Sequence, residues 1–543
     1  MRSAYRKYTT LRQASEEGAT LENNISKLQS SPKNSLVLCF NPYVRWTLHS
    51  ARQNAILHGL HKRGAHTLMV LCDGLMPECD LYQESKGPKS KRGANSCSRC
   101  QAESAFLTAK SNVNFLWLGR WLEPDTVETA KSWASELTAP HTAHYNDWPI
   151  GEWVRSSVQS HFRTELLDLD NPNTLALYQR YAAGGAIIAT GLDRLYQHEQ
   201  PDAQVLFNGR MAPTRIALEL ARLHGIKTIT EERGFVPGYM RLVKDTHCLD
   251  PKPFYALCEN WKDTPLDNTE FAELRDLLEQ HLNGTGHEIT KFAAPTEGPD
   301  QIRDRLGIDP TKKLAVLFTS STDEPQNQPE ASGCFEHQHD WVRETIKLFS
   351  AEPSWHLIVR THPNSGGKRA VGTNQQELRF IDALAKECLE NVSVVRPEDD
   401  ISSFDLIQAS DCGLVWHSSI GLEMAALGRP VFRAGRYWFR DAGFMQTTTN
   451  ADSYSSSFSE FLRAATNGLS IDKVIAAWRF AYCWFFRQSI SFPLVKQPDW
   501  ATGVAAYESL EALEPGKDKS LDRVCSIIMN GDDYSPNALL TTQ

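Results

Sequence analysis

The sequence predicts an α/β protein with two parallel sheets, each flanked by helices. Buried-strand patterns alternate with helical patterns twice, once before and once after a Gly/Pro/Thr-rich segment at 283–300. The first series opens with apolar runs at 35–40 and 67–72, and the second with runs at 313–319 and 355–360. A length of 543 residues also exceeds one ordinary core, since a domain averages about 150 residues.

This alternation predicts two Rossmann-like domains, because parallel strands joined by helices form doubly wound sheets. We expect the first domain at 1–290, the second at 291–470, and helices with a polar tail at 471–543. Ligands of such sheets bind beyond the carboxyl ends of the strands. The sequence therefore predicts that the chemistry takes place in a cleft between the two domains.

Composition is typical of a soluble globular protein and excludes several classes of function. Hydrophobic residues make up 41% and charged residues 23% of the chain. The net charge of −9, without a dense Lys/Arg stripe, argues against a nucleic-acid partner. No apolar run reaches the ~18 residues that span a bilayer, and the polar start lacks a secretory signal. We predict a cytoplasmic protein, and peripheral attachment to a membrane assembly at the inner face stays open.

Residues 402–433 carry the most informative pattern. A buried strand at 412–416 leads into a polar turn at 417–419, and helical spacing follows at 421–427. Hydroxyls and free backbone N–H groups at a helix start favour phosphate binding, which points to a nucleotide. Glu423, one turn into the helix, is then placed to bond the ribose. The alternative is an ordinary strand–helix unit with a serine N-cap.

A second motif, Arg360-Thr361-His362-Pro363, ends the strand at 355–360. It puts a cation and an imidazole at the carboxyl edge of the second sheet, where His362 can donate to a phosphate or a sugar carboxylate. Ser320 and Ser321 follow the preceding strand and reach the same edge. The alternatives are a proline that simply ends the strand and an ordinary polar turn.

Polar residues also follow the strands of the first domain. Glu231 and Glu232 precede a glycine turn, and Glu232, nearest the turn, is the predicted general base for an acceptor hydroxyl or stabiliser of a cationic sugar. A surface pair at a strand end is the alternative. Further residues expected to line the acceptor site are Asn41, Arg45, Asn208 and Arg210.

Four of the twelve cysteines, Cys72, Cys79, Cys97 and Cys100, have the spacing C-x6-C-x17-C-x2-C. A C-x2-C pair on a loop is half of a tetrahedral zinc site, although C-x6-C is looser than the usual second half. We predict a structural zinc that pins a long insertion. Unliganded thiols and an iron–sulfur cluster are the alternatives.

These motifs resemble those of bacterial capsule polysaccharide glycosyltransferases of the GT-B fold, in particular the enzymes that transfer Kdo (3-deoxy-manno-octulosonic acid). Those enzymes carry Arg-x-His-Pro, as at 360–363, and Glu-Asp-Gly-Phe, which 231–235 matches except for the inserted Arg233. Residues that match their donor-binding signature are Asp411, Ser418, Ser419, Gly421, Glu423, Ala425, Gly428, Arg429, Pro430 and Val431.

The resemblance implies a glycosyltransferase that moves a hexosyl or Kdo unit from a nucleotide sugar to a growing surface polysaccharide or related glycan. It implies two domains facing across a cleft, a C-terminal helix that crosses back to the first domain, and no catalytic divalent metal. Glu232 and His362 would be catalytic, and the donor-binding residues would be Arg360, Ser320, Ser321, His417, Ser418, Ser419, Gly421 and Glu423. Two rivals stay open: a nucleotide-sugar epimerase of the same fold, and a non-catalytic assembly protein stabilised by zinc.

Overall fold

The computed structural model describes residues 35–82, 96–285, 296–321, 323, 333–366, 374–387, 390–435, 439, 442–448, 450–499 and 502–531. These residues form two compact units. Unit 1 takes its residues from Met1–His161, Leu167–Leu249 and Ser489–Gln543, and unit 2 from Phe162–Leu166 and Asp250–Gln488. Apart from the segment 162–166, the second unit therefore starts at Asp250, earlier than the expected position 291.

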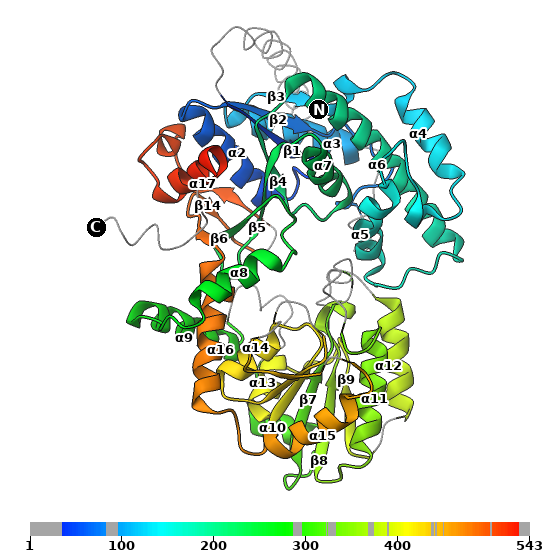
Figure 1. Ribbon diagram of the computed structural model, residues 1–543, viewed down its shortest axis with the longest axis vertical. Coiled ribbons are helices and arrows are strands. Elements are labelled where there is room, and N and C mark those ends of the chain that lie inside the picture. The colour runs from blue at the N-terminus through cyan, green and yellow to red at the C-terminus, as the bar shows by residue number, and fades with distance from the viewer. Residues whose placement is uncertain are drawn as a thin grey trace, which may run out of the picture. The chain divides into compact units, whose positions relative to one another are not determined.

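Unit 1 is built on a seven-stranded sheet with the order β13-β6-β5-β4-β1-β2-β3 (Figure 1). Its strands are β1 Leu36–Asn41, β2 His66–Leu71, β3 Phe115–Trp117, β4 Ala203–Phe207, β5 Lys227–Arg233, β6 Tyr239–Lys244 and β13 Ile490–Ser491. Strands β1 to β5 pair in parallel, with Phe40 opposite Leu206, whereas β6 and β13 are antiparallel additions. The order β3-β2-β1-β4-β5 is that of a Rossmann sheet, whose switch point lies between β1 and β4.

The helices of unit 1 are α2 Thr47–Lys62, α3 Ser96–Lys110, α4 Thr126–Ser135, α5 Ile150–Phe162, α6 Pro172–Glu199, α7 Ala212–Leu223 and α17 Lys519–Asn530. The longest helix, α6, has a capped N-terminus. The Asn171 side chain accepts from the Asn173 N–H, and Pro172 occupies the first turn. It ends at Gln200 in the left-handed region, with a φ of +48°.

The C-terminal helix α17 returns to unit 1 and packs beside α2, as the red and blue helices of Figure 1 show. Leu521 of α17 is fully buried in the core that α2 shares with the sheet. Gly59 permits this approach, because an added Cβ would lie 2.9 Å from Leu521 Cδ2. Burying one such leucine contributes about 2 kcal/mol. The expectation of a C-terminal helix that crosses back to the first domain is confirmed.

Unit 2 is built on a six-stranded, fully parallel sheet with the order β12-β11-β10-β7-β8-β9. Its strands are β7 Lys313–Phe318, β8 Trp355–Arg360, β9 Val392–Val395, β10 Cys412–Val415, β11 Val431–Arg433 and β12 Gln446–Thr447. Read from β9, this is again the Rossmann order, with its switch point between β7 and β10. The two strands at the switch point, β7 and β10, are fully buried apart from Lys313, as expected of a sheet covered on both faces.

The helices of unit 2 lie before, between and after the strands of the second sheet in the chain. They are α8 Lys252–Trp261, α9 Asn268–Leu282, α10 Pro299–Arg305, α11 Gln338–Phe349, α12 Gln375–Glu387, α13 Ser403–Ala409, α14 Ile420–Ala426, α15 Tyr454–Ala465 and α16 Ile471–Tyr482. A buried hydrogen-bond pair fixes α11 against α15, because the Trp341 indole donates to the Tyr454 hydroxyl at 2.9 Å. Helices α8 and α9, placed in the first domain by the sequence, belong to unit 2.

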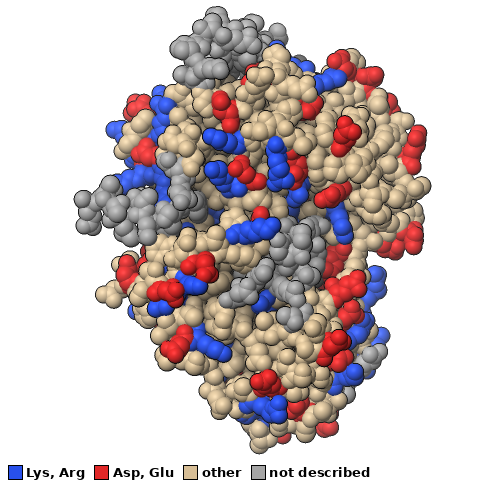
Figure 2. Space-filling model, in the orientation of Figure 1, with Lys and Arg blue, Asp and Glu red and all other residues tan. Residues whose placement is uncertain are grey.

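Short elements complete the chain. They are the single-turn 3-10 helices Leu118–Trp121, Pro140–Thr142, Pro363–Ser365 and Leu510–Leu513, the π-helical turn Cys483–Arg487, and a separate antiparallel pair, β14 Val495–Lys496 with β15 Val504–Ala505. Among the described residues, no helix is long and apolar enough to cross a membrane. On the face drawn in Figure 2, basic and acidic side chains are interspersed.

Candidate active site

The polar residues predicted to bind the donor lie after β7, β8 and β10 of unit 2. The loops after β7 and β10 meet at the switch point, where the His417 backbone N–H donates to Ser320 Oγ at 3.0 Å. The Gln338 side chain also accepts from the Ser320 N–H at 2.7 Å. Ser320 therefore links the ends of β7 and β10 to the first residue of α11, and these bonds stabilise the fold of unit 2.

Ser418 and Ser419 lie partly exposed on the turn after β10. Ser418 Oγ accepts the Ile420 N–H at 3.3 Å, and Ser419 is the N-cap of α14 without a capping bond from its side chain. Gly421 allows α14 to approach β10, since an added Cβ would lie 2.9 Å from Val415 Cγ2. Helix α14 has only seven residues. Because α14 is so short, the hydroxyl and backbone N–H groups of this turn contribute more to its polarity than the helix dipole does.

His362 follows β8 and is held from two sides. Its backbone N–H donates to Thr319 Oγ1 at 2.9 Å, and its Nδ1 accepts the Asn364 N–H at 3.1 Å. The second bond assigns the ring proton to Nε2. Burial, together with the Arg360 guanidinium, lowers the pKa of His362 to about 4. At neutral pH this imidazole is uncharged and offers a single N–H donor.

A short segment between α5 and α6, residues 162–166, supplies a further cation to unit 2. Arg163, at a φ of +58°, donates to Asp323 Oδ2 at 3.0 Å, and the Ser321 hydroxyl donates to Asp323 Oδ1 at 2.6 Å. Both Arg163 and Asp323 act electrostatically on His362. No sequence pattern links Arg163 to this site, because Arg163 lies more than a hundred residues before the strands of the second sheet.

Two other predicted donor residues bond neighbouring elements of unit 2. Arg360, 2% exposed, donates to the backbone carbonyls of Arg396 at 2.6 Å and Ile401 at 3.2 Å. Glu423 Oε2 lies 3.0 Å from Nδ1 of His281 on α9, and both residues are buried. These contacts explain both side chains as structural groups.

In unit 1 the switch point carries an imidazole between two carboxylates. Glu231 on β5 has no exposed surface, and both of its oxygens lie 3.0 Å from Nδ1 of His49 on α2. Gln53, one turn further along α2, donates to Glu231 Oε1 at 3.1 Å. His49 Nε2 lies 3.7 Å from Glu232 Oε1, and the imidazole packs against the Phe207 ring. His49 is not among the residues predicted from the sequence.

Glu232 is ionised at neutral pH. Burial alone would raise the pKa of Glu232, but the charges of His49 and Arg233 and two hydrogen bonds outweigh it and lower the pKa to about 2. The bonds come from the Asn208 side-chain amide and, at 2.8 Å, from the Arg233 backbone N–H. Asn208 itself has a φ of +56°, a conformation that asparagine tolerates better than most residues. A carboxylate of such low pKa is a weak base.

The other residues expected to contact the acceptor have separate neighbours. Asn41 donates to the Ser50 hydroxyl at 3.1 Å. Arg210 is buried and donates to the hydroxyls of two α5 serines at 2.8 and 3.1 Å. Arg45 is exposed and donates to the Tyr82 hydroxyl at 3.2 Å. Asn208, by contrast, donates a hydrogen bond to Glu232.

The structure does not support the predicted zinc site. Among the described residues, no three His, Cys, Asp or Glu side chains are grouped so that they could hold a metal ion. Cys97 and Cys100 lie in the first turns of α3 and not on a loop. Burial raises the pKa of the Cys79 thiol well above its ordinary value and that of Cys72 to about 12.

Taken together, the two sheets define an α/β protein with two Rossmann-like units and a C-terminal segment that returns to the first, the GT-B type of fold. The chain matches no protein-family model and no curated protein sequence.

Solved structures do resemble it. A KpsC of Thermosulfurimonas dismutans, a beta Kdo 2,4 transferase, is 14% identical over 58% of this chain and 88% of that one, with a TM-score of 0.33. A KpsC beta Kdo 2,7 transferase of the same organism is 14% identical over 60% and 88%, with a TM-score of 0.34. The UDP-GlcNAc 2-epimerase of Neisseria meningitidis, bound to UDP-GlcNAc, is 12% identical over 82% and 95%, with a TM-score of 0.27. At these values the likeness carries no argument about activity, and the fold assignment rests on the strand orders.

Proposed function

We propose that the protein is a glycosyltransferase that moves a sugar from a nucleotide-sugar donor to a glycan acceptor. The observation that carries the proposal is the cluster of His49, Glu231 and Glu232 at the switch point of unit 1. Transfer requires a group that accepts the proton of the attacking hydroxyl, and it also requires donors that stabilise a departing phosphate. Unit 2 offers such donors after β8 and β10.

For the donor, we propose that the nucleotide phosphate lies against Ser418, Ser419 and His362. Neutral His362 would donate from Nε2, and the two hydroxyls are partly exposed. Such hydrogen bonds strengthen as negative charge develops on the leaving phosphate, so they favour the transition state over the bound substrate. Arg163 is paired with Asp323, so its role would be to maintain the local field and not to bind the phosphate as a free cation.

For the acceptor, we propose that His49 takes the hydroxyl proton. Its Nδ1 faces Glu231, so a neutral ring would keep its proton on Nδ1 and offer Nε2 as the acceptor, whereas the pKa of Glu232 given above applies beside the charged ring. Glu232, with a pKa of about 2, is the weaker base. Its negative charge would instead stabilise the imidazolium and the positive charge that develops on the sugar. The role of general base, which the sequence predicted for Glu232, is thus proposed for His49.

The finer parts of the assignment are also proposals. We infer a surface polysaccharide or related glycan as the acceptor, at the inner face of the cell membrane, from the motifs at 231–235, 360–363 and 411–431. The inserted Arg233 leaves the choice between a Kdo and a hexosyl donor open.

The test of donor binding is a thermal-shift panel of CMP-, UDP-, GDP- and CDP-linked sugars, since a ligand that binds only the folded protein raises its melting temperature. We expect one nucleotide class to raise it in the wild type, and the shift to shrink in His362→Ala and Ser419→Ala. Ser456→Ala, an exposed serine on α15 of the same unit, is the matched control. Unchanged shifts in both site variants would remove the proposed donor site.

The test of activity is turnover of that donor with and without a glycan acceptor. Acceptor-dependent release of the nucleotide supports transfer. Conversion of the sugar without acceptor would favour an epimerase, in which the carboxylates serve elimination and re-addition. Absence of any nucleotide binding would favour a non-catalytic assembly protein.

A further inference from the structure

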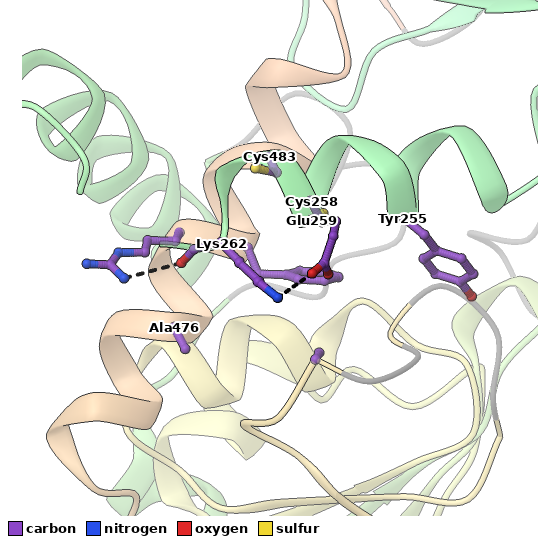
Figure 3. Close-up of a pocket in the computed structure, with 9 residues that line it drawn as sticks. Tyr255, Cys258, Glu259, Lys262, Ala476 and Cys483 are labelled. Atoms are coloured by element: carbon purple, nitrogen blue, oxygen red, sulfur yellow. Dashed lines mark hydrogen bonds and ion pairs between the residues drawn. The ribbon is translucent and has the colours of Figure 1, made fainter. Parts of the chain in front are cut away.

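Unit 2 contains a cavity of about 320 Å³ that is lined by none of the predicted donor-binding residues (Figure 3). Helices α8 and α16 supply most of the wall. The residues that line it are Tyr255, Cys258, Glu259, Lys262, Ala442, Ala476, Arg479, Phe480 and Cys483. Two cysteines, distant in sequence, therefore border one cavity, and Figure 3 labels both sulfur-bearing side chains there.

Local backbone geometry brings these cysteines together. Helix α16 ends at Tyr482 and continues as a π-helical turn, Cys483–Arg487, which packs against α8. Turns of this kind are rare and frequently occur at functional sites. The turn presents Cys483 to Cys258 of α8, so that the two thiols border the same cavity and act on each other electrostatically. Both are free thiols in the structure.

The surroundings make the two thiols chemically unequal. Arg487 Nη1 lies 3.9 Å from Cys483 Sγ, while its guanidinium stacks 3.7 Å from the centroid of the Trp261 ring and bonds Glu270. Interaction with the Cys258 thiol lowers the pKa of Cys483, burial opposes this, and Arg487 adds to the lowering. Burial raises the pKa of Cys258. Cys483 is thus the thiol that more readily becomes a thiolate, the reactive form.

We propose that Cys258 and Cys483 form a reversible dithiol–disulfide site that peroxides oxidise. The Cys483 thiolate attacks one peroxide oxygen, so that an S–O bond forms, the O–O bond breaks, and the leaving oxygen takes a proton and departs as water or an alcohol. Cys483 is then a sulfenic acid. The Cys258 thiol loses its proton, its sulfur attacks the sulfenic sulfur, and hydroxide leaves with that proton as water. Overall two thiols are oxidised by two electrons and one peroxide is reduced by two.

The position of the pair gives the bond a defined mechanical effect. The main part of unit 2 runs without interruption from Asp250 to Gln488. Helix α8 begins two residues after its start, and the turn that holds Cys483 ends one residue before its end. A disulfide would therefore tie the segment that opens unit 2 to the segment that closes it. Closing so long a loop restricts the unfolded chain, so oxidation should raise the melting temperature of unit 2.

The experiment treats the full-length protein with hydrogen peroxide and maps its digest by mass spectrometry without reduction. We expect the dominant linked species to join the peptides of Cys258 and Cys483, to lack two hydrogen atoms relative to the free pair, and to disappear with dithiothreitol. A linked species of other cysteines, or none at peroxide doses that oxidise Cys97 and Cys100, overturns the proposal. Because this readout uses the wild type, it does not depend on the folding of any variant.

Variants then test the order of the two steps. In Cys258→Ser, the sulfenic acid of Cys483 has no resolving thiol, and a dimedone-type reagent should trap it; in Cys483→Ser, no adduct should form at position 258. Cys334→Ser is the matched control, since it removes a similarly buried thiol of the same unit, 7% exposed against 9% for Cys258. Trapping at Cys258 in preference to Cys483 would refute the assignment of the nucleophile.

Discussion

Removing the charge of Glu232 should destabilise unit 1 at neutral pH and matter far less in acid. The pKa of Glu232 is about 2 in the folded protein against an ordinary value of 4.5. Each pKa unit corresponds to about 1.4 kcal/mol, so ionised Glu232 contributes about 3 kcal/mol to the free energy of unfolding where the neighbouring His49 is charged. Its side chain is only 15% exposed, so solvent screens little of this contribution.

The lowered pKa of Glu232 determines how its contribution to the free energy of unfolding changes with pH. Because the folded protein holds the proton of Glu232 less tightly than the unfolded chain, the contribution is complete above pH 4.5 and disappears as the pH falls through 2. At pH 3 about 1.4 kcal/mol should remain. The difference between wild type and Glu232→Gln should therefore shrink by about half between pH 7 and pH 3.

The assay is urea unfolding of both proteins at several pH values, followed by tryptophan fluorescence. Glu136→Gln, which neutralises an exposed carboxylate of the same unit, is the control and should show no such trend. A gap between wild type and Glu232→Gln that stays constant from pH 7 to pH 3 would refute the electrostatic account of this cluster. A variant as stable as the wild type at pH 7 would refute it equally.

Four further outcomes are expected. His49→Asn should reduce acceptor-dependent transfer by about 10²- to 10⁴-fold, while thermal shifts with the donor stay as in the wild type. Leu521→Ala should cost about 2–5 kcal/mol in urea unfolding, because it opens a cavity between α17 and α2. Tyr454→Phe removes the partner of the buried Trp341 indole and should cost about 1–3 kcal/mol in the same assay. Cys97→Ser should leave the melting temperature unchanged, and elemental analysis of the purified wild type should find no stoichiometric zinc.

Sheet strands were predictable because buried parallel strands are continuous apolar runs. The run at 355–360 coincides with β8, and the run at 35–40 differs from β1 by one residue at each end. The domain boundary was less predictable. A Gly/Pro/Thr-rich composition marks a loop, but it does not reveal on which core the preceding helices α8 and α9 pack.

In the candidate site, too, some residues could be predicted from the sequence and others could not. Residues that follow strands, such as Ser418 and Glu232, could be found because strand ends meet at one sheet edge. His49 could not, because it lies on a helix and its partner Glu231 is nearly two hundred residues away. The zinc prediction is not supported: cysteine spacing alone does not tell a loop from the helix that contains Cys97 and Cys100, and the described residues show no group of side chains that could hold a metal ion.

The return of α17 to unit 1 also sets an order of events during synthesis. Apart from 162–166, unit 2 is continuous from Asp250 to Gln488, so all of it leaves the ribosome before the last part of unit 1 does. Domains generally fold as units while the chain is made. Unit 1 must therefore wait, with the core surface of α2 uncovered around Gly59, until Leu521 has been synthesised. Nascent chains stopped after unit 2 should expose this apolar surface to chaperones, and release of the last helix should end that exposure.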